Sequence, residues 1–345
     1  MKPLRQLSIE HGFICLLSSC SQTATTAAQT NVCVRERLGL LFGNTLTAGR
    51  NMAGSPRNGS IDLLRGLAAF GIVWFHAKAP QASLGLSGLT VFLLLLIVMN
   101  ASPLIPFERA VADRANRLLR PWVVWSAIYA LAKTAQAMHS NHPLSDEFSS
   151  SMLLCGPALH LWFLPFSFFA LVALSGLERR LSLQTRGFFG FSLVLCLFAL
   201  PVSDSLANAT LGHPLLEWAA AIPPLVIGVA LRSAGSSPVR QCIVLSAAIL
   251  SFAGVYGTGG EAPIGVLIGL VLVLLALNFS IPDTSASRWV AFMSMAIYLM
   301  HPIFLSPLAR GAMADKPILL TVAATCLSVL VGECIRRTSL SKMAL

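Results

Sequence analysis

Two ionisable residues, Arg65 and His76, stand in one long apolar segment of the chain. They are eleven positions apart, so on an α-helix they differ by about 20° around the axis and by about 16 Å along it. Ionisable side chains are costly in lipid, so the helix face that carries both should line protein or a water-filled cavity. An imidazole there can act as a general base, and a guanidinium can stabilise negative charge. A hydrogen-bonded structural histidine and an interfacial arginine anchor are the alternatives.

A second group, Arg114, Arg117 and Arg120, precedes another apolar segment. On a regular helix their spacing of three covers one broad side. Guanidinium groups bind oxyanions bidentately, so this side is a suitable clamp for phosphates. A basic anchor that fixes the orientation of a membrane helix is the alternative.

Two later apolar segments also carry polar residues. His160 and Trp162 stand at the start of one segment, where a helix cap and an interfacial aromatic belt are the structural alternatives. Ser294, Tyr298 and His301 share a helix face in the other segment. Hydrogen bonding between helices would also account for that polar stripe.

The composition places the chain among multi-span membrane proteins. Of its 345 residues, 55% are hydrophobic and 11% are charged, whereas soluble domains carry about 25% charged residues. The mean hydropathy is +0.75. The formal net charge of +10 comes from basic residues scattered between apolar segments, a pattern of membrane topology rather than of nucleic-acid binding. Eight cysteines without a CxxC pair indicate neither a metal site nor a disulfide framework.

We predict an all-α, polytopic integral membrane protein with about ten transmembrane helices of roughly 17–22 residues. The expected spans are 61–78, 84–101, 119–136, 160–177, 187–202, 214–231, 240–256, 262–279, 289–306 and 317–335. Arginine-rich loops alternate with loops that hold few basic residues, which places both termini in the cytoplasm. The arginine groups then lie toward the cytoplasm and the imidazoles further out. This layout suits a phosphorylated donor that enters from the cytosol.

The two ends of the chain are predicted to lie outside the membrane domain. Residues 1–58 are polar and hold no segment long enough to span, and their apolar run is too short for a signal peptide. We expect a disordered cytoplasmic extension, or an over-long reading frame whose true start is Met52. Residues 338–345 are expected to form a cytoplasmic tail.

The four groups, in this order, resemble the membrane acyltransferase-3 family, which transfers acyl groups, usually acetyl, onto cell-surface carbohydrates. The first group is similar to the family's first-helix signature, an arginine followed after ten residues by a histidine. The quoted stretches are Asp62-Leu-Leu-Arg65 with Phe75-His76, Arg114-x-x-Arg117 with Arg120-Pro121, His160-Leu-Trp162-Phe-Leu-Pro165, and Tyr298-Leu-Met-His301-Pro302. The resemblance covers roughly residues 58–337. The second span departs from it, because no Ser-Gly follows Phe92 where the family has one.

The resemblance implies an acyltransferase domain over residues 59–337, in the inner (plasma) membrane, that uses acetyl-CoA or another acyl-CoA and no metal. The acceptor is expected to be a carbohydrate or a lipid-linked sugar. The implied roles are catalysis for His76 and Arg65, CoA binding for Arg114, Arg117 and Arg120, and the acceptor path for His160, Trp162, Tyr298 and His301. A transporter or flippase that uses the same cavity without chemistry is the alternative function.

Overall fold

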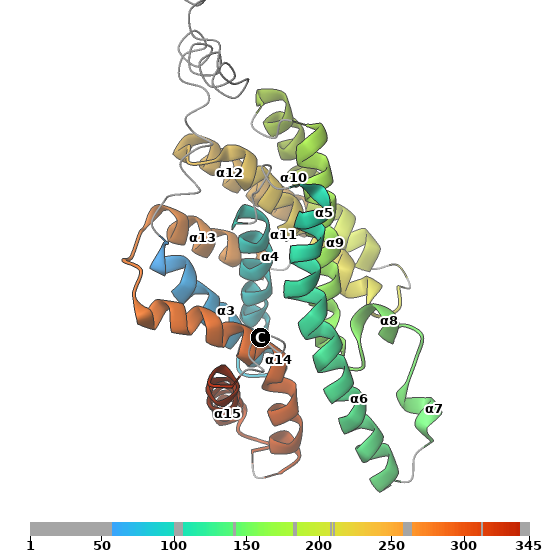
Figure 1. The fold of residues 1–345 in the computed structure, drawn as a ribbon. Helices are drawn as coiled ribbons and strands as arrows, with labels where there is room; N and C mark the ends of the chain where they lie inside the picture. The colour runs from blue at the N-terminus through green and yellow to red at the C-terminus, as the bar shows by residue number, and fades with distance from the viewer. Residues whose placement is uncertain are drawn as a thin grey trace, which may run out of the picture. The chain divides into compact units, whose positions relative to one another are not determined.

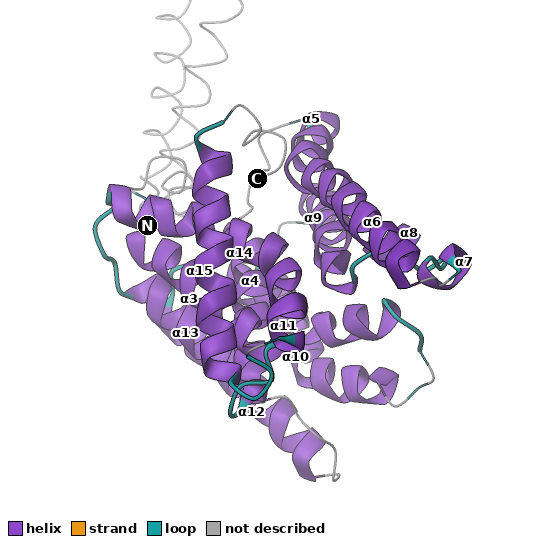
Figure 2. Ribbon diagram, turned by 90° about the horizontal axis from the view of Figure 1, so that it is seen from below, coloured by secondary structure: helices purple, strands orange, loops and turns teal. Residues whose placement is uncertain are grey.

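The computed structural model describes residues 57–99, 106–140, 143–181, 185–207, 209, 211–257, 264–311 and 313–338. These residues form helices, turns and loops, with no strand among them (Figure 1, Figure 2). The predicted extension and tail lie outside them, except for Arg57, Asn58 and Thr338. The elements are α3 (Gly59–His76), η1 (Ala82–Leu86), α4 (Ser87–Met99), α5 (Phe107–Arg114), η2 (Ala115–Leu119), α6 (Arg120–Ser140), α7 (Leu144–Glu147), α8 (Met152–Cys155), η3 (Leu159–Trp162), α9 (Phe163–Arg180), α10 (Arg186–Ala207), α11 (Leu215–Ala234), α12 (Pro238–Gly257), α13 (Ile264–Asn278), α14 (Ser285–Arg310) and α15 (Pro317–Arg336).

Seven helical segments in the described part of the chain are long and apolar enough to cross a bilayer. They are Ala82–Met99, Leu159–Arg180, Arg186–Ala207, Leu215–Ala234, Pro238–Gly257, Ser285–Arg310 and Pro317–Arg336. The other three predicted spans are also helices, but α13 is shorter, and α3 and α6 carry more polar residues. The structure confirms an all-helical polytopic protein, while ten spans and cytoplasmic termini stay predictions.

Helix α3 is fixed at its start by its own cap and by the chain before α14. The side chain of Asn58 accepts a hydrogen bond of 2.9 Å from the Ser60 main-chain N–H, and it donates one of 2.8 Å to the Ala276 carbonyl. The Ser60 hydroxyl accepts a bond of 3.0 Å from the main-chain N–H of Ile281. The first bond satisfies an N–H that a helix start leaves unpaired, and the second satisfies a carbonyl at the end of α13. They also hold α3 beside α14.

Glycines let α3 lie close to two neighbouring helices. Gly88 faces Ala68 and Gly85 faces Gly71, so α4 and the turn before it run antiparallel to α3. Gly66 faces Val290 near the start of α14, and His76 and His301 meet further along both helices. Helices α3 and α14 are therefore parallel. Close approach through small residues is the usual way for membrane helices to pack.

Replacing Gly88 with alanine is expected to destabilise the protein, although alanine favours helices. A Cβ at Gly88 would clash with the main-chain oxygen of Ala68, which a change of rotamer cannot move. Overpacking of this kind costs about 1–3 kcal/mol. We expect a lower thermal midpoint in detergent, measured by fluorescence-detected gel filtration after heating. Gly190→Ala is the matched control on α10, because nothing lies within 4 Å of its added Cβ. Equal midpoints for the two variants would contradict the close packing.

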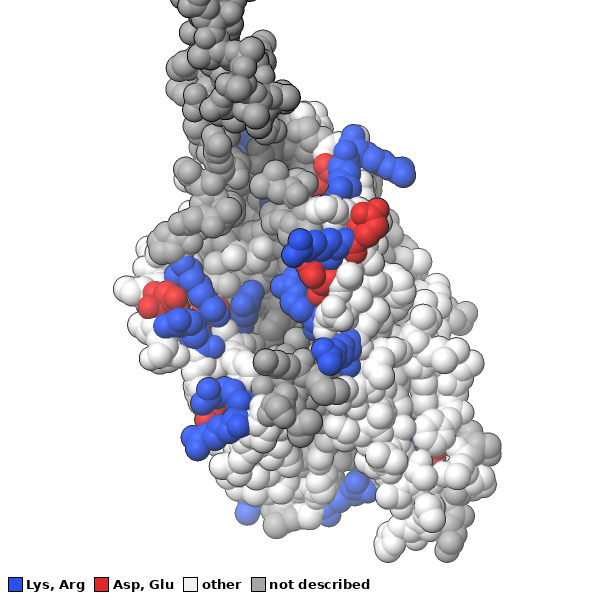
Figure 3. Space-filling view, in the orientation of Figure 1, with Lys and Arg blue, Asp and Glu red and all other residues white. Residues whose placement is uncertain are grey.

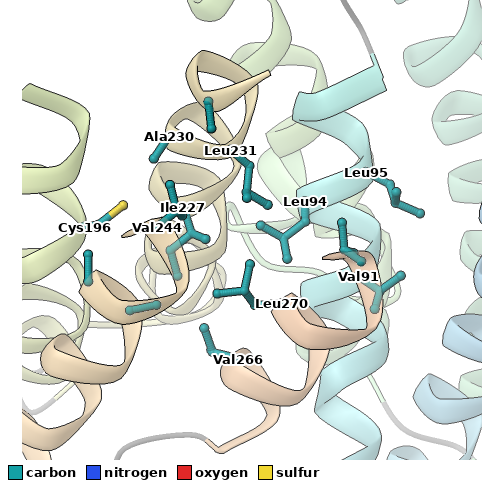
Figure 4. Packing of buried hydrophobic residues seen from close by; sticks show 14 of the residues in the cluster. Val91, Leu94, Leu95, Cys196, Ile227, Ala230, Leu231, Val244, Val266 and Leu270 are labelled. Carbon is teal, nitrogen blue, oxygen red and sulfur yellow. The ribbon is translucent and has the colours of Figure 1, made fainter. Parts of the chain in front are cut away.

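Helix α4 is the centre of the larger apolar core. Figure 4 shows Leu94 of α4 pointing toward Leu231 of α11 and Leu270 of α13. All three side chains are buried. The outer faces differ, since Leu131 of α6 and Leu330 of α15 are 71% and 64% exposed. Burial of apolar groups at the centre and their exposure outside is the pattern expected in a bilayer.

Candidate active site

Three imidazoles from different parts of the chain form a row. The ring centroids of His76 and His301 are 5.1 Å apart, and those of His301 and His160 are 5.4 Å apart. His76 is the last residue of α3, His301 lies within α14, and His160 lies in the η3 turn before α9. His76 is exposed, whereas His301 is 0% and His160 9% exposed. The row therefore runs from an accessible ring to two buried ones.

The orientation of His301 follows from the proline after it. Pro302 has no main-chain N–H, so the carbonyl of Tyr298, four residues earlier, loses its usual partner in the helix. Nδ1 of His301 lies 2.9 Å from this carbonyl oxygen and 3.1 Å from that of Ile297. Because carbonyl oxygens only accept, Nδ1 carries the hydrogen, and Nε2 of the neutral ring is an acceptor.

Each of the two buried rings has a nitrogen that makes no hydrogen bond among the described residues. Nε2 of His301 and Nε2 of His160 are buried and have no hydrogen-bond partner among the described residues. A buried polar atom without a partner costs about 1–3 kcal/mol. The ring next to His301 on the accessible side is His76. Nε2 of His301 is thus an acceptor without a partner in the described part of the chain, and the rings of His76 and His160 lie on either side of it.

Two tyrosines tie the turn that carries His160 to α14. The hydroxyl of Tyr298 donates to the main-chain oxygen of His160. The hydroxyl of Tyr129 on α6 donates to the carbonyl of Leu299 over 2.8 Å, and its ring lies 5.1 Å from that of His160. Tyr129 belongs to none of the sequence motifs, and its contacts join residues 170 positions apart. No local pattern could have identified it.

Trp162 belongs to the packed interior rather than to the surface. It is 6% exposed, and its ring centroid lies 5.6 Å from that of Phe166. This burial argues against an aromatic belt. Ser294, on the same face of α14 as His301, donates to the carbonyl of Ala291 over 2.7 Å. The structure therefore gathers His76, His160 and His301, with Trp162 as part of the surrounding core.

Arg65 lies apart from the imidazoles. Its Nη1 is 3.5 Å from a carboxylate oxygen of Asp62, and the other oxygen accepts a bond of 2.6 Å from Nε of Arg57. The hydrogen bond from Arg57 to Asp62 raises the pKa of Arg57. Arg65 and His76 keep their separation of about 16 Å along α3, so they do not act on the same atom. The sequence already indicates the ion pair between Asp62 and Arg65, because residues three apart are neighbours on a helix surface.

The arginines of the second group occupy unlike environments. Arg114 is 4% exposed, whereas Arg117 and Arg120 are exposed. Residues 115–119 form a π-helical turn between α5 and α6, which changes the helical register that regular spacing assumes. The three guanidinium groups therefore do not form one face.

Arg114 lies in a larger charged cluster at the ends of α5, α9 and α11. The charged groups that act on it are Arg117, Glu178, Arg179 and Arg232. Burial, and next the charge of Arg117, lower the pKa of Arg114. Figure 3 shows basic and acidic side chains together over α5 and the start of α6. Sequence reasoning missed Glu178 and Arg232, because no motif joins residues so far apart.

Comparison with protein families gives a match over most of the chain. The model of the acyltransferase-3 family, described as an acyltransferase domain, matches residues 58–336. The match includes every residue of the imidazole row and of the charged cluster. No curated protein and no solved structure was found to match the chain.

Proposed function

Because the chain belongs to the acyltransferase-3 family, we propose that this membrane acyltransferase moves an acyl group from acyl-CoA to a carbohydrate hydroxyl. We take acetyl-CoA as the donor, and a cell-surface, exported or lipid-linked sugar as the acceptor, at the inner membrane. The observation that carries the proposal is the contact between the accessible ring of His76 and the buried ring of His301. An imidazole held by a second group is the usual form of a general base.

The proposed reaction is direct transfer with His76 as the base. The acceptor oxygen attacks the thioester carbonyl carbon while a ring nitrogen of His76 takes the hydroxyl proton. The carbon–sulfur bond then breaks, and His76 returns the proton to the CoA thiolate. His301 accepts the other ring N–H of His76 through Nε2, which fixes the tautomer and the ring orientation. His301 is a positioning residue in this scheme, since it acts through His76.

The arginines are proposed to bind the phosphates of the donor. Arg65 stands near the start of α3, and α3 and α4 are antiparallel, so this end of α3 lies at the end of α4. The same end of α4 carries Ile97, whose carbonyl accepts from Arg232 in the charged cluster over 3.0 Å. Arg65 and the charged cluster thus lie toward one end, and the imidazoles toward the other. An extended CoA molecule has its phosphates and its thioester separated in this way.

The proposal is tested with labelled acetyl-CoA. Membranes that contain the protein, and membranes without it, are incubated with the donor and a range of purified surface polysaccharides and lipid-linked sugars. We expect label in the carbohydrate fraction only with the protein. Binding of CoA without transfer to any of these carbohydrates would support the donor and reject the proposed acceptor. Movement of a solute across vesicles by a protein that does not bind CoA would favour the transporter instead.

Replacing Arg65 with alanine is expected to raise the KM for acetyl-CoA about tenfold, since a charge-assisted bond to phosphate is worth about 1.5–3 kcal/mol. Arg57→Ala is the matched control, because both side chains contact the same carboxylate of Asp62. Initial rates at varied acetyl-CoA concentration measure the effect. If Arg65 only neutralised Asp62, the two variants would behave alike.

A further inference from the structure

The charged cluster at the ends of α5, α9 and α11 has more positive than negative groups. Arg117, Arg179 and Arg232 and one carboxylate, that of Glu178, act on Arg114. Glu178 in turn is acted on by Arg232 and Arg114. Arg179 lies 5.5 Å from the centroid of the Phe107 ring. Arg114 is 4% exposed, and its Nη1 atom has no hydrogen-bond partner among the described residues. Buried charges are normally paired, because an uncompensated one loses its hydration. A further anion bound beside Arg114 would therefore supply a missing partner and reduce the net positive charge of the cluster.

Glu178 holds the place that such an anion would take beside Arg232. Nη2 of Arg232 pairs with Oε1 of Glu178, and Nη1 donates to the Ile97 carbonyl over 3.0 Å. The two paired side chains are only 11% and 7% exposed. Nη1 of Arg232 is thus bound to the main chain at the end of α4, and Nη2 is bound to a carboxylate. A phosphate oxygen can accept from Nη2 with the same geometry.

We propose that Arg114 and Arg232 form a phosphate site in which Glu178 is a displaceable counter-ion. When a phosphate enters, it takes over Nη2 of Arg232 and supplies the partner that Nη1 of Arg114 lacks. Glu178 leaves Arg232 at that step, so the site exchanges one anion for another and no charge is left unpaired. The inference rests on the proposed function where it names acyl-CoA as the source of the phosphate. The headgroup of an acidic phospholipid offers the same chemistry.

The test measures binding of CoA and of inorganic pyrophosphate to the full chain in phosphatidylcholine nanodiscs. Glu178→Gln keeps the shape of the side chain and removes the competing charge. We expect it to bind CoA about tenfold more tightly, the equivalent of one weakly screened charge interaction. The double variant R232M/E178M is expected to bind about tenfold more weakly. It should still fold, because apolar replacement of a whole buried pair is often neutral.

The control pair lies elsewhere, between α6 and α7. Nζ of Lys133 is 3.7 Å from Oε2 of Glu147, and Glu147→Gln should leave CoA binding unchanged. If the Arg232–Glu178 pair only joined α9 to α11, Glu178→Gln would lower the thermal midpoint and leave the Kd for CoA as in wild type. That result would overturn the inference and leave the proposed acyltransfer intact.

The same experiment separates the sources of phosphate. Binding of pyrophosphate but not of CoA by wild type would support the site and reject the proposed donor. Wild type is also placed in phosphatidylglycerol nanodiscs. If it then binds CoA more weakly than in phosphatidylcholine nanodiscs, and the double variant shows no such difference, the site is supported with a lipid headgroup as its ligand. Binding of none of the three would overturn it.

Discussion

Replacing His76 with alanine is expected to lower the rate of acyl transfer by about 10²–10⁴-fold, the contribution of a well-placed general base. The effect should fall on kcat rather than on the KM for acetyl-CoA, because the proposed phosphate-binding arginines lie toward the other end of α3 and α4. His76 is exposed at the end of α3, so its truncation should cost little stability and the protein should reach the membrane in normal amount. Transfer of label to the acceptor, per amount of protein in the membrane, is the measurement.

The control for this variant is His139→Ala on α6. His139 is also exposed and lies near the end of a helix, but it has no part in the imidazole row. Equal activity of the His76 and His139 variants would reject the general-base role. It would also reject one-step acyl transfer at the imidazole row, and another residue would have to act as the base or nucleophile.

The sequence predicts the helices well, because apolar runs of spanning length have few other structures open to them in lipid. The expected span 317–335 and the observed α15 (Pro317–Arg336) differ by one residue. The prediction is less certain where polar residues enter a helix. Helix α3 keeps Asp62 and Arg65 within its first turns, where Asp62 pairs with both Arg57 and Arg65. A hydropathy pattern cannot show that compensation.

The site is predictable where its signal is local. The dipeptide His301-Pro302 is such a signal, because a proline frees a carbonyl four residues earlier and the preceding imidazole is within reach of it. The contact between His76 and His301 joins α3 to α14 and is not local. It depends on small residues such as Gly66 that let the two helices approach. The π-helical turn after Arg114 is likewise invisible to a count of spacings.

The strongest test of the row beyond His76 is the comparison of two substitutions at His301. His301→Phe keeps a ring of similar size in a fully buried place but removes both nitrogens. His301→Gln loses the ring but keeps a side-chain oxygen that can accept the N–H of His76. We expect the phenylalanine variant to lower kcat by about 10–100-fold, the usual cost of losing a group that orients a catalytic residue. The KM for acetyl-CoA should stay as in wild type.

The order of the two variants decides between positioning and packing. If His301 orients His76, the glutamine variant will be the more active one, although its core is less well filled. If His301 only fills space between α3 and α14, the phenylalanine variant will be the more active, because loss of ring volume leaves a cavity. Thermal midpoints of both proteins in detergent separate the two effects, since packing loss lowers the midpoint and loss of the acceptor lowers kcat. A phenylalanine variant with wild-type kcat would show that His76 works without His301.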